Sequence, residues 1–163
     1  MKSLQALTLC AAALLAQLAQ AADTMAPAPA PAPAAAANPL AAARTLIDAR
    51  QWAAALTELR RVDDAGNADW NNLMGYVLRK SGNADLAASE RHYDAALRID
   101  PHHRNALEYS GELYLMKGEL AKAQARLSTL AAECKAGCQQ YNELKEAITR
   151  YQANGNKYLA QGW

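Results

Sequence analysis

The stretch "YSGELYLMKGELAKAQARL", residues 109–127, decides the fold because it spaces small residues regularly inside a helical pattern. Gly111 and Gly118 are seven residues apart, and Ala123 follows five residues later. A glycine inside a helix costs about 1 kcal/mol relative to alanine, so Gly111 needs a packing reason. We expect Gly111 at a close crossing of two helices and Gly118 in the left-handed conformation that ends a helix. Ala123 would clear space in the second helix.

The same three small residues occur 36 residues earlier in the chain, as Gly75, Gly82 and Ala87. This spacing predicts a repeated helical hairpin, in which the first glycine lets the second helix approach the first. The sequence "IDP" closes the earlier unit, and Pro101 is placed to start the following helix. An ordinary helical bundle is the alternative fold.

The two units resemble the tetratricopeptide repeat family. "NNLMGYVLRKSGNADLAASERHYDAALRIDP" supplies the family positions Met74, Gly75, Gly82, Ala87, Tyr93, Ala96 and Pro101. "NALEYSGELYLMKGELAKAQARLSTL" supplies Gly111, Tyr114, Gly118, Ala123 and Leu127.

The match to the family departs from its pattern in four places. Leu78 stands where the first tyrosine of the family would be, and Ser110 replaces the leucine before the glycine. The later unit has no closing proline. The interval from Gly82 to Tyr93 is two residues longer than the family has, for which we expect a lengthened second helix.

Weaker units flank the two central ones. In "PLAAARTLIDARQWAAALTELRRVDDAG", Ala43 replaces the helical glycine and Arg50 the turn glycine, while four residues keep the spacing of a second helix: Trp52, Ala55, Leu59 and Val62. "CQQYNELKEAITRYQA" has one apolar stripe, typical of a terminal capping helix. We expect an all-α fold over residues 40–153. By the resemblance, it is a right-handed superhelix of antiparallel helix pairs with a C-terminal capping helix, before a tail at 154–163.

The first forty residues indicate export. Residues 1–22 have the layout of a signal peptide, with Lys2, an apolar run and small residues for cleavage. An uncleaved membrane anchor is the alternative. Residues 23–39 are rich in proline and alanine, which alternate from residue 26 to residue 34, a composition that favours an extended linker. We therefore expect an exported protein of the bacterial periplasm, which touches a membrane only if the signal is kept.

The balance of charge argues against a nucleic-acid partner. Loss of Lys2 with the signal would leave sixteen basic and sixteen acidic residues, a formal charge of zero. Nucleic-acid binding needs a basic face.

Two cysteines remain after removal of a signal peptide that contains Cys10. Cys134 and Cys138 bracket a turn in "ECKAGC", where Gly137 is a natural helix terminator. An even pair in an exported chain suggests a structural disulfide. Free thiols and a metal or redox function are the alternatives.

No arrangement of residues indicates catalysis, a metal or a cofactor. Ser110 beside Gly111 lacks the flanking glycines of a hydrolase nucleophile turn. His102 and His103 follow Pro101 without a third ligand, and we expect them to be solvated. The chain is therefore expected not to be an enzyme.

The resemblance implies a peptide-binding groove lined by the first helix of each unit. The groove positions of the family fall on Asn72, Tyr76, Arg79, Lys80, Asn105, Glu108, Glu112, Leu115 and Met116. The polar members would hold the backbone of an extended peptide, and Leu115 with Met116 would take an apolar side chain. The expected function is a non-enzymatic scaffold for another protein or peptide. The alternative is an envelope assembly or cofactor-maturation accessory protein with a redox-active Cys134–Cys138 pair.

Overall fold

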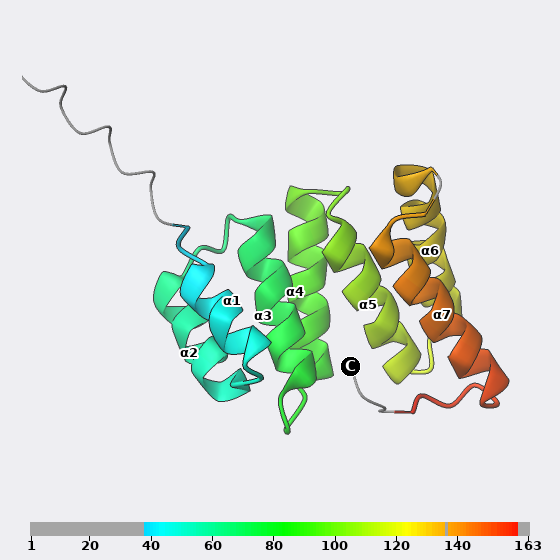
Figure 1. Ribbon diagram of the computed structural model, residues 1–163, viewed down its shortest axis with the longest axis horizontal. Helices are drawn as coiled ribbons and strands as arrows, with labels where there is room; N and C mark the ends of the chain where they lie inside the picture. The colour runs from blue at the N-terminus through cyan, green and yellow to red at the C-terminus, as the bar shows by residue number, and fades with distance from the viewer. Residues whose placement is uncertain (1–37, 136, 160–163) are drawn as a thin grey trace, which may run out of the picture. The chain divides into compact units, whose positions relative to one another are not determined.

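The computed structural model describes residues 38–135 and 137–159, and these residues form seven helices and no strand (Figure 1). The all-α prediction is confirmed. The expected signal peptide and all but the end of the expected linker lie outside the described residues. The helices are α1 (Ala41–Asp48), α2 (Trp52–Val62), α3 (Ala68–Lys80), α4 (Leu86–Ile99), α5 (Arg104–Met116), α6 (Leu120–Cys134) and α7 (Gln139–Ala153).

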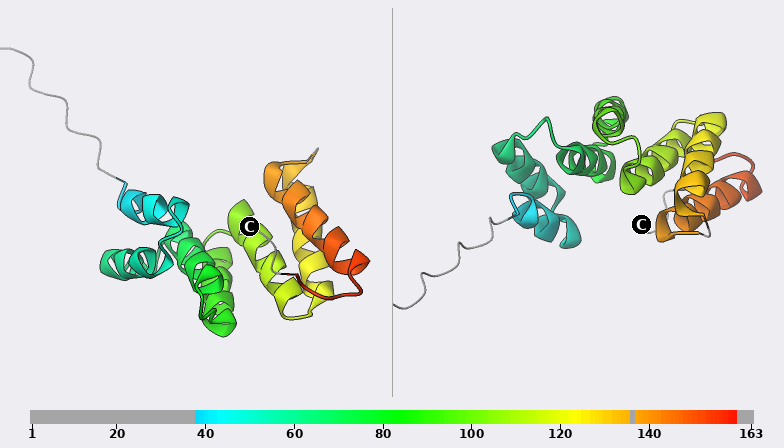
Figure 2. Two further views of the ribbon diagram at one scale, coloured as in Figure 1. Left: turned by 60° about the horizontal axis from the view of Figure 1, so that its bottom comes forward. Right: turned by 90° about the horizontal axis from the view of Figure 1, so that it is seen from above.

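The hairpins stack side by side, so that their helices form two layers. Each helix packs against the next one in the chain, and contacts also join α3 to α5 and α5 to α7. The odd-numbered helices lie along one side and the even-numbered helices along the other (Figure 2). The buried apolar residues divide into three clusters along the chain, as expected where each hairpin contacts only its neighbours.

Polar side chains set the start of three helices. Asn67 Oδ1 accepts a hydrogen bond from the Trp70 N–H at 3.2 Å, and Asp85 Oδ1 accepts one from the Ala88 N–H at 2.9 Å. His103 Nδ1 caps α5 in the same way, at 3.1 Å from the Ala106 nitrogen. The prediction that Pro101 starts the following helix is therefore wrong, since Pro101 lies in the turn before the cap of α5. A capping role also replaces the solvated one expected for His103.

Gly75 lies at the crossing of α3 and α4, as predicted. A Cβ at this position would lie 2.8 Å from two ring carbons of Tyr93 and 3.1 Å from the Ser89 carbonyl oxygen. The Ser89 hydroxyl donates a hydrogen bond of 2.7 Å to the Gly75 carbonyl. Such close backbone approach requires glycine on α3 and a small residue on α4.

The small residue on α4 is Ser89, and the role predicted for Ala87 is wrong. Ala87 is exposed, whereas Ser89 and Ala123 are fully buried. The two additional residues of this unit lie in the turn 81–85, which is longer than the turn 117–119 between α5 and α6. The expected lengthening of the second helix is absent, since α4 has 14 residues and α6 has 15.

The two turn glycines also differ. Gly118 has φ +77° and completes a Schellman turn, with Glu119 N–H bonded to Tyr114 C=O at 2.8 Å and Gly118 N–H to Leu115 C=O at 3.1 Å. Gly82 is not among the positive-φ residues of the described chain, and nothing lies within 4 Å of a Cβ built there. The left-handed role expected for Gly82 is therefore wrong.

Arg50 occupies the left-handed position of the first unit, at φ 56°. Its N–H bonds to Ile47 C=O and the Gln51 N–H bonds to Leu46 C=O, both at 2.8 Å, which is the hydrogen-bond pattern found at Gly118. The α1–α2 turn therefore repeats the α5–α6 turn with arginine in place of glycine.

Replacing Arg50 by glycine should stabilise the protein. Left-handed backbone costs an ordinary L-residue about 1 kcal/mol or more, and glycine avoids this cost but loses more chain entropy on folding. We expect Arg50→Gly to raise the free energy of unfolding by about 0.5–1 kcal/mol, measured by urea denaturation. Arg50→Ala is the control, because it removes the charge and keeps the strain. An equal gain from alanine would contradict the backbone explanation.

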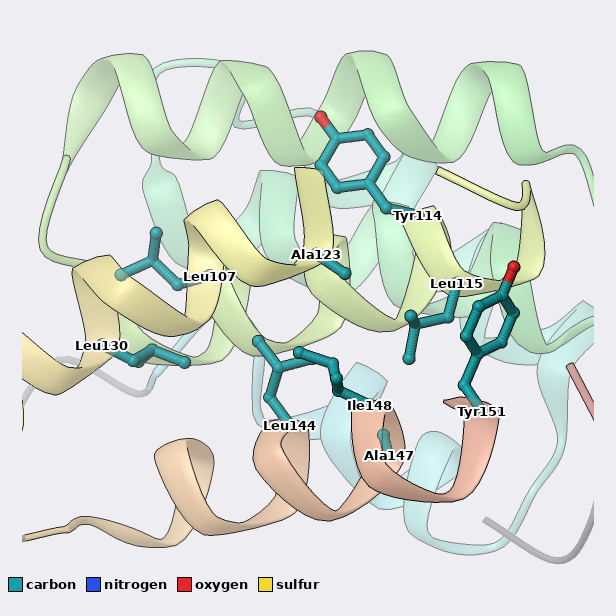
Figure 3. Packing of buried hydrophobic residues seen from close by; sticks show 9 residues of the cluster. All are labelled: Leu107, Tyr114, Leu115, Ala123, Leu130, Leu144, Ala147, Ile148 and Tyr151. Carbon is teal, nitrogen blue, oxygen red and sulfur yellow. The ribbon is translucent and has the colours of Figure 1, made fainter. Parts of the chain in front are cut away.

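Gly111 is also at a crossing, but its close neighbour is α7 and not the second helix of its hairpin. The three nearest atoms to a Cβ built on Gly111 all belong to Leu144, with its two methyl carbons at 2.5 and 2.6 Å. Leu144 is fully buried in a cluster shared by α5, α6 and α7, which we call the α5–α7 cluster (Figure 3). Its members are Leu107, Tyr114, Leu115, Ala123, Leu130, Leu144, Ala147, Ile148 and Tyr151.

A disulfide joins α6 to the start of α7. Cys134 and Cys138 are bonded, with their Cα atoms 5.4 Å apart, as the sequence predicted. Cys134 is the last residue of α6 and Cys138 is the N-cap of α7. Gly137 lies between them at φ +95°, in the turn where the sequence places a helix terminator.

Candidate functional site

The inner helices α1, α3 and α5 enclose a surface hollow of about 240 Å³. Its walls come from residues one turn apart on each helix, because side chains at i and i+3 or i+4 share a helix face. The lining residues are Arg44, Ile47, Asp48, Asn72, Leu73, Tyr76, Asn105 and Tyr109. Three predicted groove residues, Asn72, Tyr76 and Asn105, are thus brought together.

Asn72 is a buried polar residue of this hollow whose side-chain oxygen lacks a hydrogen-bond donor among the described residues. Its exposed fraction is 1%, and no described residue donates a hydrogen bond to its Oδ1. Its neighbour Asn71 is also buried but is fully engaged, since its Nδ2 donates to the carbonyls of Ala65 and Asn67 and its Oδ1 contacts His92 Nδ1 at 3.1 Å. An unpartnered buried acceptor is costly, and a ligand N–H that reaches the covered Asn72 Oδ1 after a local rearrangement would satisfy it.

Asn105 is partly occupied within the protein. Its Oδ1 accepts a hydrogen bond of 2.8 Å from Gln140 Nε2, which ties α5 to α7. Asn105 therefore has less hydrogen-bonding capacity left for a ligand than Asn72 has.

Aromatic rings form the floor between α3 and α5. The Tyr76 and Tyr109 ring centroids are 4.7 Å apart, and Trp52 approaches Tyr76 edge-on at 6.1 Å. Burial raises the pKa of both tyrosines, so both phenols are neutral at physiological pH. The rings supply rigid apolar area beside the free oxygen of Asn72.

Arg79 is held inside the protein by α5. Its Nη1 lies 2.6 Å from Glu112 Oε2, with the two side chains 2% and 5% exposed. The guanidinium carbon also lies 5.6 Å from the Tyr76 ring centroid and 5.7 Å from that of Tyr109. Burial works against the charge of Arg79, but Tyr93 and Glu112 outweigh it and raise its pKa. Arg79 and Glu112 therefore form a buried ion pair between helices, and the expected direct contact of either with a peptide is not supported.

Glu108 belongs to a carboxyl cluster at the α5–α7 contact. Burial raises its pKa to about 9, assisted by a hydrogen bond with Glu143 and by repulsion from Glu112, while Arg79 opposes the shift. With its pKa raised above neutrality, Glu108 favours the protonated form and shares a side-chain hydrogen bond with Glu143 of α7. It is a structural residue and not one that meets a peptide.

The remaining predicted groove residues do not line the hollow. Leu115 is fully buried in the α5–α7 cluster, while Lys80 and Met116 are half-buried at the C-terminal ends of α3 and α5. Lys80 Nζ lies 5.9 Å from the Tyr76 ring centroid, and burial followed by repulsion from Arg79 lowers its pKa.

The sequence reading missed the contribution of α1 and of Tyr109. Arg44 and Ile47 line the hollow, and Arg44 Nη2 forms an ion pair of 2.9 Å with Asp69 Oδ2 on α3. A signal was present: Arg44 follows Ala43 as Tyr76 follows Gly75. Aligning the first unit with the second on these residues predicts that Arg44 lines the groove beside Tyr76.

The described residues contain no group of three or more His, Cys, Asp or Glu side chains placed as metal ligands would be. Within residues 38–135 and 137–159, no helix is long and apolar enough to span a bilayer.

The hollow, the free oxygen of Asn72 and the aromatic floor lie together on the inner helices, beside the Arg79–Glu112 pair. Comparison of the chain with protein-family models, with curated proteins and with solved structures finds no match.

Proposed function

We propose that this protein is a non-enzymatic binding module that takes an extended peptide segment of another protein along α1, α3 and α5. The observation that carries the proposal is the buried Oδ1 of Asn72, which lacks a hydrogen-bond donor at the wall of a hollow. An extended segment carries regularly spaced backbone N–H groups that meet this need. The aromatic floor of Tyr76 and Tyr109 suits one apolar side chain of that segment.

The resemblance to tetratricopeptide repeats supports the same reading. Repeated hairpins with Gly75 and Gly111 at crossings, and inner helices that share a hollow, support the proposal of stacked helix pairs. The right-handed superhelix is proposed from the resemblance to the family. We further propose that the chain works in the bacterial periplasm, on the basis of the signal-like residues 1–22.

The test is selection of peptides against the chain from residue 23 onward. We expect a phage-displayed library of random ten-residue peptides to yield binders that lose at least tenfold in affinity on Asn72→Leu. This variant keeps the approximate shape of the side chain and removes an oxygen that has no partner in the free protein. Its free energy of unfolding should therefore stay the same or rise by about 1–3 kcal/mol.

Asn71→Leu is the matched control, because Asn71 is the adjacent residue and is similarly buried. Loss of its three hydrogen-bond contacts should lower the free energy of unfolding by about 1–3 kcal/mol and leave peptide affinity unchanged. Selected peptides that bind the Asn72→Leu variant as tightly as the unchanged chain would refute the proposed groove. A library that yields no binding peptide would also refute it.

A redox-active accessory protein is the second candidate. The observation in its favour is that Cys138 stands at the N-cap position of α7, where the helix dipole stabilises a thiolate. The reduction potential of the Cys134–Cys138 disulfide, measured against glutathione, distinguishes a redox-active accessory protein from a binding module. A structural disulfide resists reduction by the glutathione couple.

A further inference from the structure

Gln140 determines which end of the Asn105 side chain is left for a ligand. A side-chain amide has an acceptor oxygen and a nitrogen that donates two hydrogen bonds. Gln140 Nε2 donates to Asn105 Oδ1 at 2.8 Å, so the acceptor of Asn105 is used within the protein. What remains of the Asn105 amide is its donor, Nδ2.

The donor of Asn105 reaches the surface. None of the described residues accepts a hydrogen bond from Asn105 Nδ2. This nitrogen is also not among the covered side-chain atoms that lack a partner, and the side chain as a whole is half-buried. Asn105 Nδ2 therefore meets a bound molecule directly, whereas the Oδ1 of Asn72 is covered.

Asn105 stands between two hollows. It lines the hollow of about 240 Å³ that contains Asn72, and also a second hollow of about 350 Å³ at the N-terminal end of α5. Gln140 lines the second hollow and does not line the first. The side chain that holds the Asn105 oxygen thus comes from the side of the second hollow.

Asn72 and Asn105 offer opposite groups to the hollow that they share. Asn72 Oδ1 lacks a donor among the described residues, and Asn105 Nδ2 lacks an acceptor among them. In an extended chain, the N–H and C=O of one residue lie on the same edge, as in the hydrogen-bonded pairs of an antiparallel sheet. A single residue of an extended segment therefore supplies both missing partners.

We infer that Gln140 is a positioning residue for peptide binding, which orients the Asn105 amide so that Nδ2 donates to a backbone carbonyl of the bound segment. Asn72 accepts the N–H of the same peptide residue, after the local rearrangement that uncovers its oxygen. The partner residue at this point is not proline, because proline has no N–H. The inference rests on the proposed peptide-binding function and extends its site from α1, α3 and α5 to α7.

The first measurement needs no peptide. Gln140→Glu puts an acceptor where Gln140 donates, so the Asn105 amide must turn over and donate to the new carboxylate. We expect the side-chain amide signals of Asn105 to move downfield in a proton–nitrogen correlation spectrum, because a charged acceptor shortens the hydrogen bond. The urea midpoint should stay close to that of the unchanged chain, since the hydrogen bond is kept with its direction reversed. Unmoved Asn105 signals would overturn the orientation assigned to the amide.

The second measurement is the affinity of the tightest Asn72-dependent peptide from the library, resynthesised with fluorescein and followed by anisotropy. Gln140→Glu should weaken its binding about fivefold or more, because the Asn105 oxygen then faces the peptide carbonyl. Gln140→Lys keeps a donor at this position and should recover most of the loss. An equal loss in both variants would show that Gln140 supports the site only by its shape.

Gln139→Glu is the matched control for charge. It adds the same charge one residue earlier on α7, where Gln139 contacts Glu143 and not Asn105. It should leave peptide affinity unchanged. A loss equal to that of Gln140→Glu would mean that repulsion by a negative charge, and not the orientation of Asn105, weakens binding, and the inference would be wrong.

Changes to the peptide backbone locate the residue that the two amides hold. N-methylation of one backbone nitrogen should weaken binding to the unchanged chain about tenfold, with little further effect on Asn72→Leu. An ester in place of the following peptide bond weakens the carbonyl of the same residue. It should lower affinity for the unchanged chain but not for Gln140→Glu. Equal sensitivity of both chains to the ester would overturn the carbonyl contact, as would a dependence on Gln140 that disappears when an acidic peptide side chain is replaced by its amide.

These outcomes separate the inference from the proposed function. Asn72-dependent peptides that bind Gln140→Glu as tightly as the unchanged chain would leave the groove in place and overturn the role of Gln140. If the library yields no Asn72-dependent peptide, the proposed function fails, and the inference fails with it.

Discussion

Gly111→Leu is expected to lower the free energy of unfolding by about 3 kcal/mol or more. Even the Cβ of the new residue would lie 2.5 and 2.6 Å from the methyl carbons of Leu144, and the rest of the side chain would extend further into the crossing. Leu144 is fully buried, so a leucine at residue 111 must either displace the Leu144 side chain within the cluster or push α7 away from α5. Urea denaturation followed by circular dichroism measures the loss.

Gly82→Ala is the control for the general effect of replacing a repeat glycine. Nothing lies within 4 Å of its Cβ position and its backbone is not left-handed, so we expect a change below about 0.5 kcal/mol. A left-handed Gly82 would instead predict that Gly82→Ala lowers the free energy of unfolding by about 1 kcal/mol. Comparable losses for the two variants would mean that Gly111 is not at a tight crossing.

A double-mutant cycle identifies the neighbour. Gly111→Ala combined with Leu144→Ala should cost at least 1 kcal/mol less than the sum of the single changes, because the shorter side chain makes room for the new Cβ. Additive losses would indicate that α7 is not the helix against which Gly111 packs.

The hairpins could be predicted from sequence because their small residues are local requirements of the backbone. Gly75 and Gly111 each stand where a Cβ would collide with a neighbouring helix, and Gly118 stands where the backbone is left-handed. Even Arg50 was placed correctly in the turn of the first unit, since the spacing from Ala43 to Ala55 equals that from Gly111 to Ala123. A repeated spacing thus transfers well when the turn has the same length.

The register of α4 could not be predicted in this way. The turn at 81–85 absorbs two additional residues without disturbing either helix, and such turns tolerate insertion at little energetic cost. Ala87 matches Ala123 in sequence spacing, but Ser89 matches it in burial. Both residues are small, so residue type alone does not distinguish them.

Part of the candidate site followed from the pattern and part depended on distant partners. Asn72, Tyr76 and Asn105 line the hollow because helical spacing alone places them on the inner face. Whether Arg79 meets solvent depends on Glu112, a residue on another helix whose carboxylate neutralises it. A sequence lists both charges but does not show that they meet.

The pH dependence of stability should be dominated above pH 7 by Glu108. Its pKa is about 9 in the folded protein, where burial is the main cause, against an ordinary value of 4.5. Between these values the folded state holds a proton that the unfolded state releases, so the free energy of unfolding falls as pH rises. The stabilisation is complete below pH 4.5 and is lost as pH rises through 9. From pH 7 to 9 we expect a loss of about 2 kcal/mol, in a range above the titration of most histidines.

Glu108→Gln should remove most of this loss, because the amide is neutral throughout and can still donate a hydrogen bond to Glu143. The difference in stability between the variant and the unchanged chain should therefore shift by about 2 kcal/mol in favour of the variant from pH 7 to pH 9, measured by urea denaturation in matched buffers. Glu143→Gln tests the contribution of Glu143 to the raised pKa of Glu108, because it removes the repulsion between the two carboxyl groups. The free energy of unfolding should then fall less between pH 7 and pH 9. The same slope in Glu108→Gln and the unchanged chain would show that Glu108 is ionised in the folded protein. The contact between α5 and α7 would then have to hold a buried charge, balanced by Arg79, in place of a shared proton.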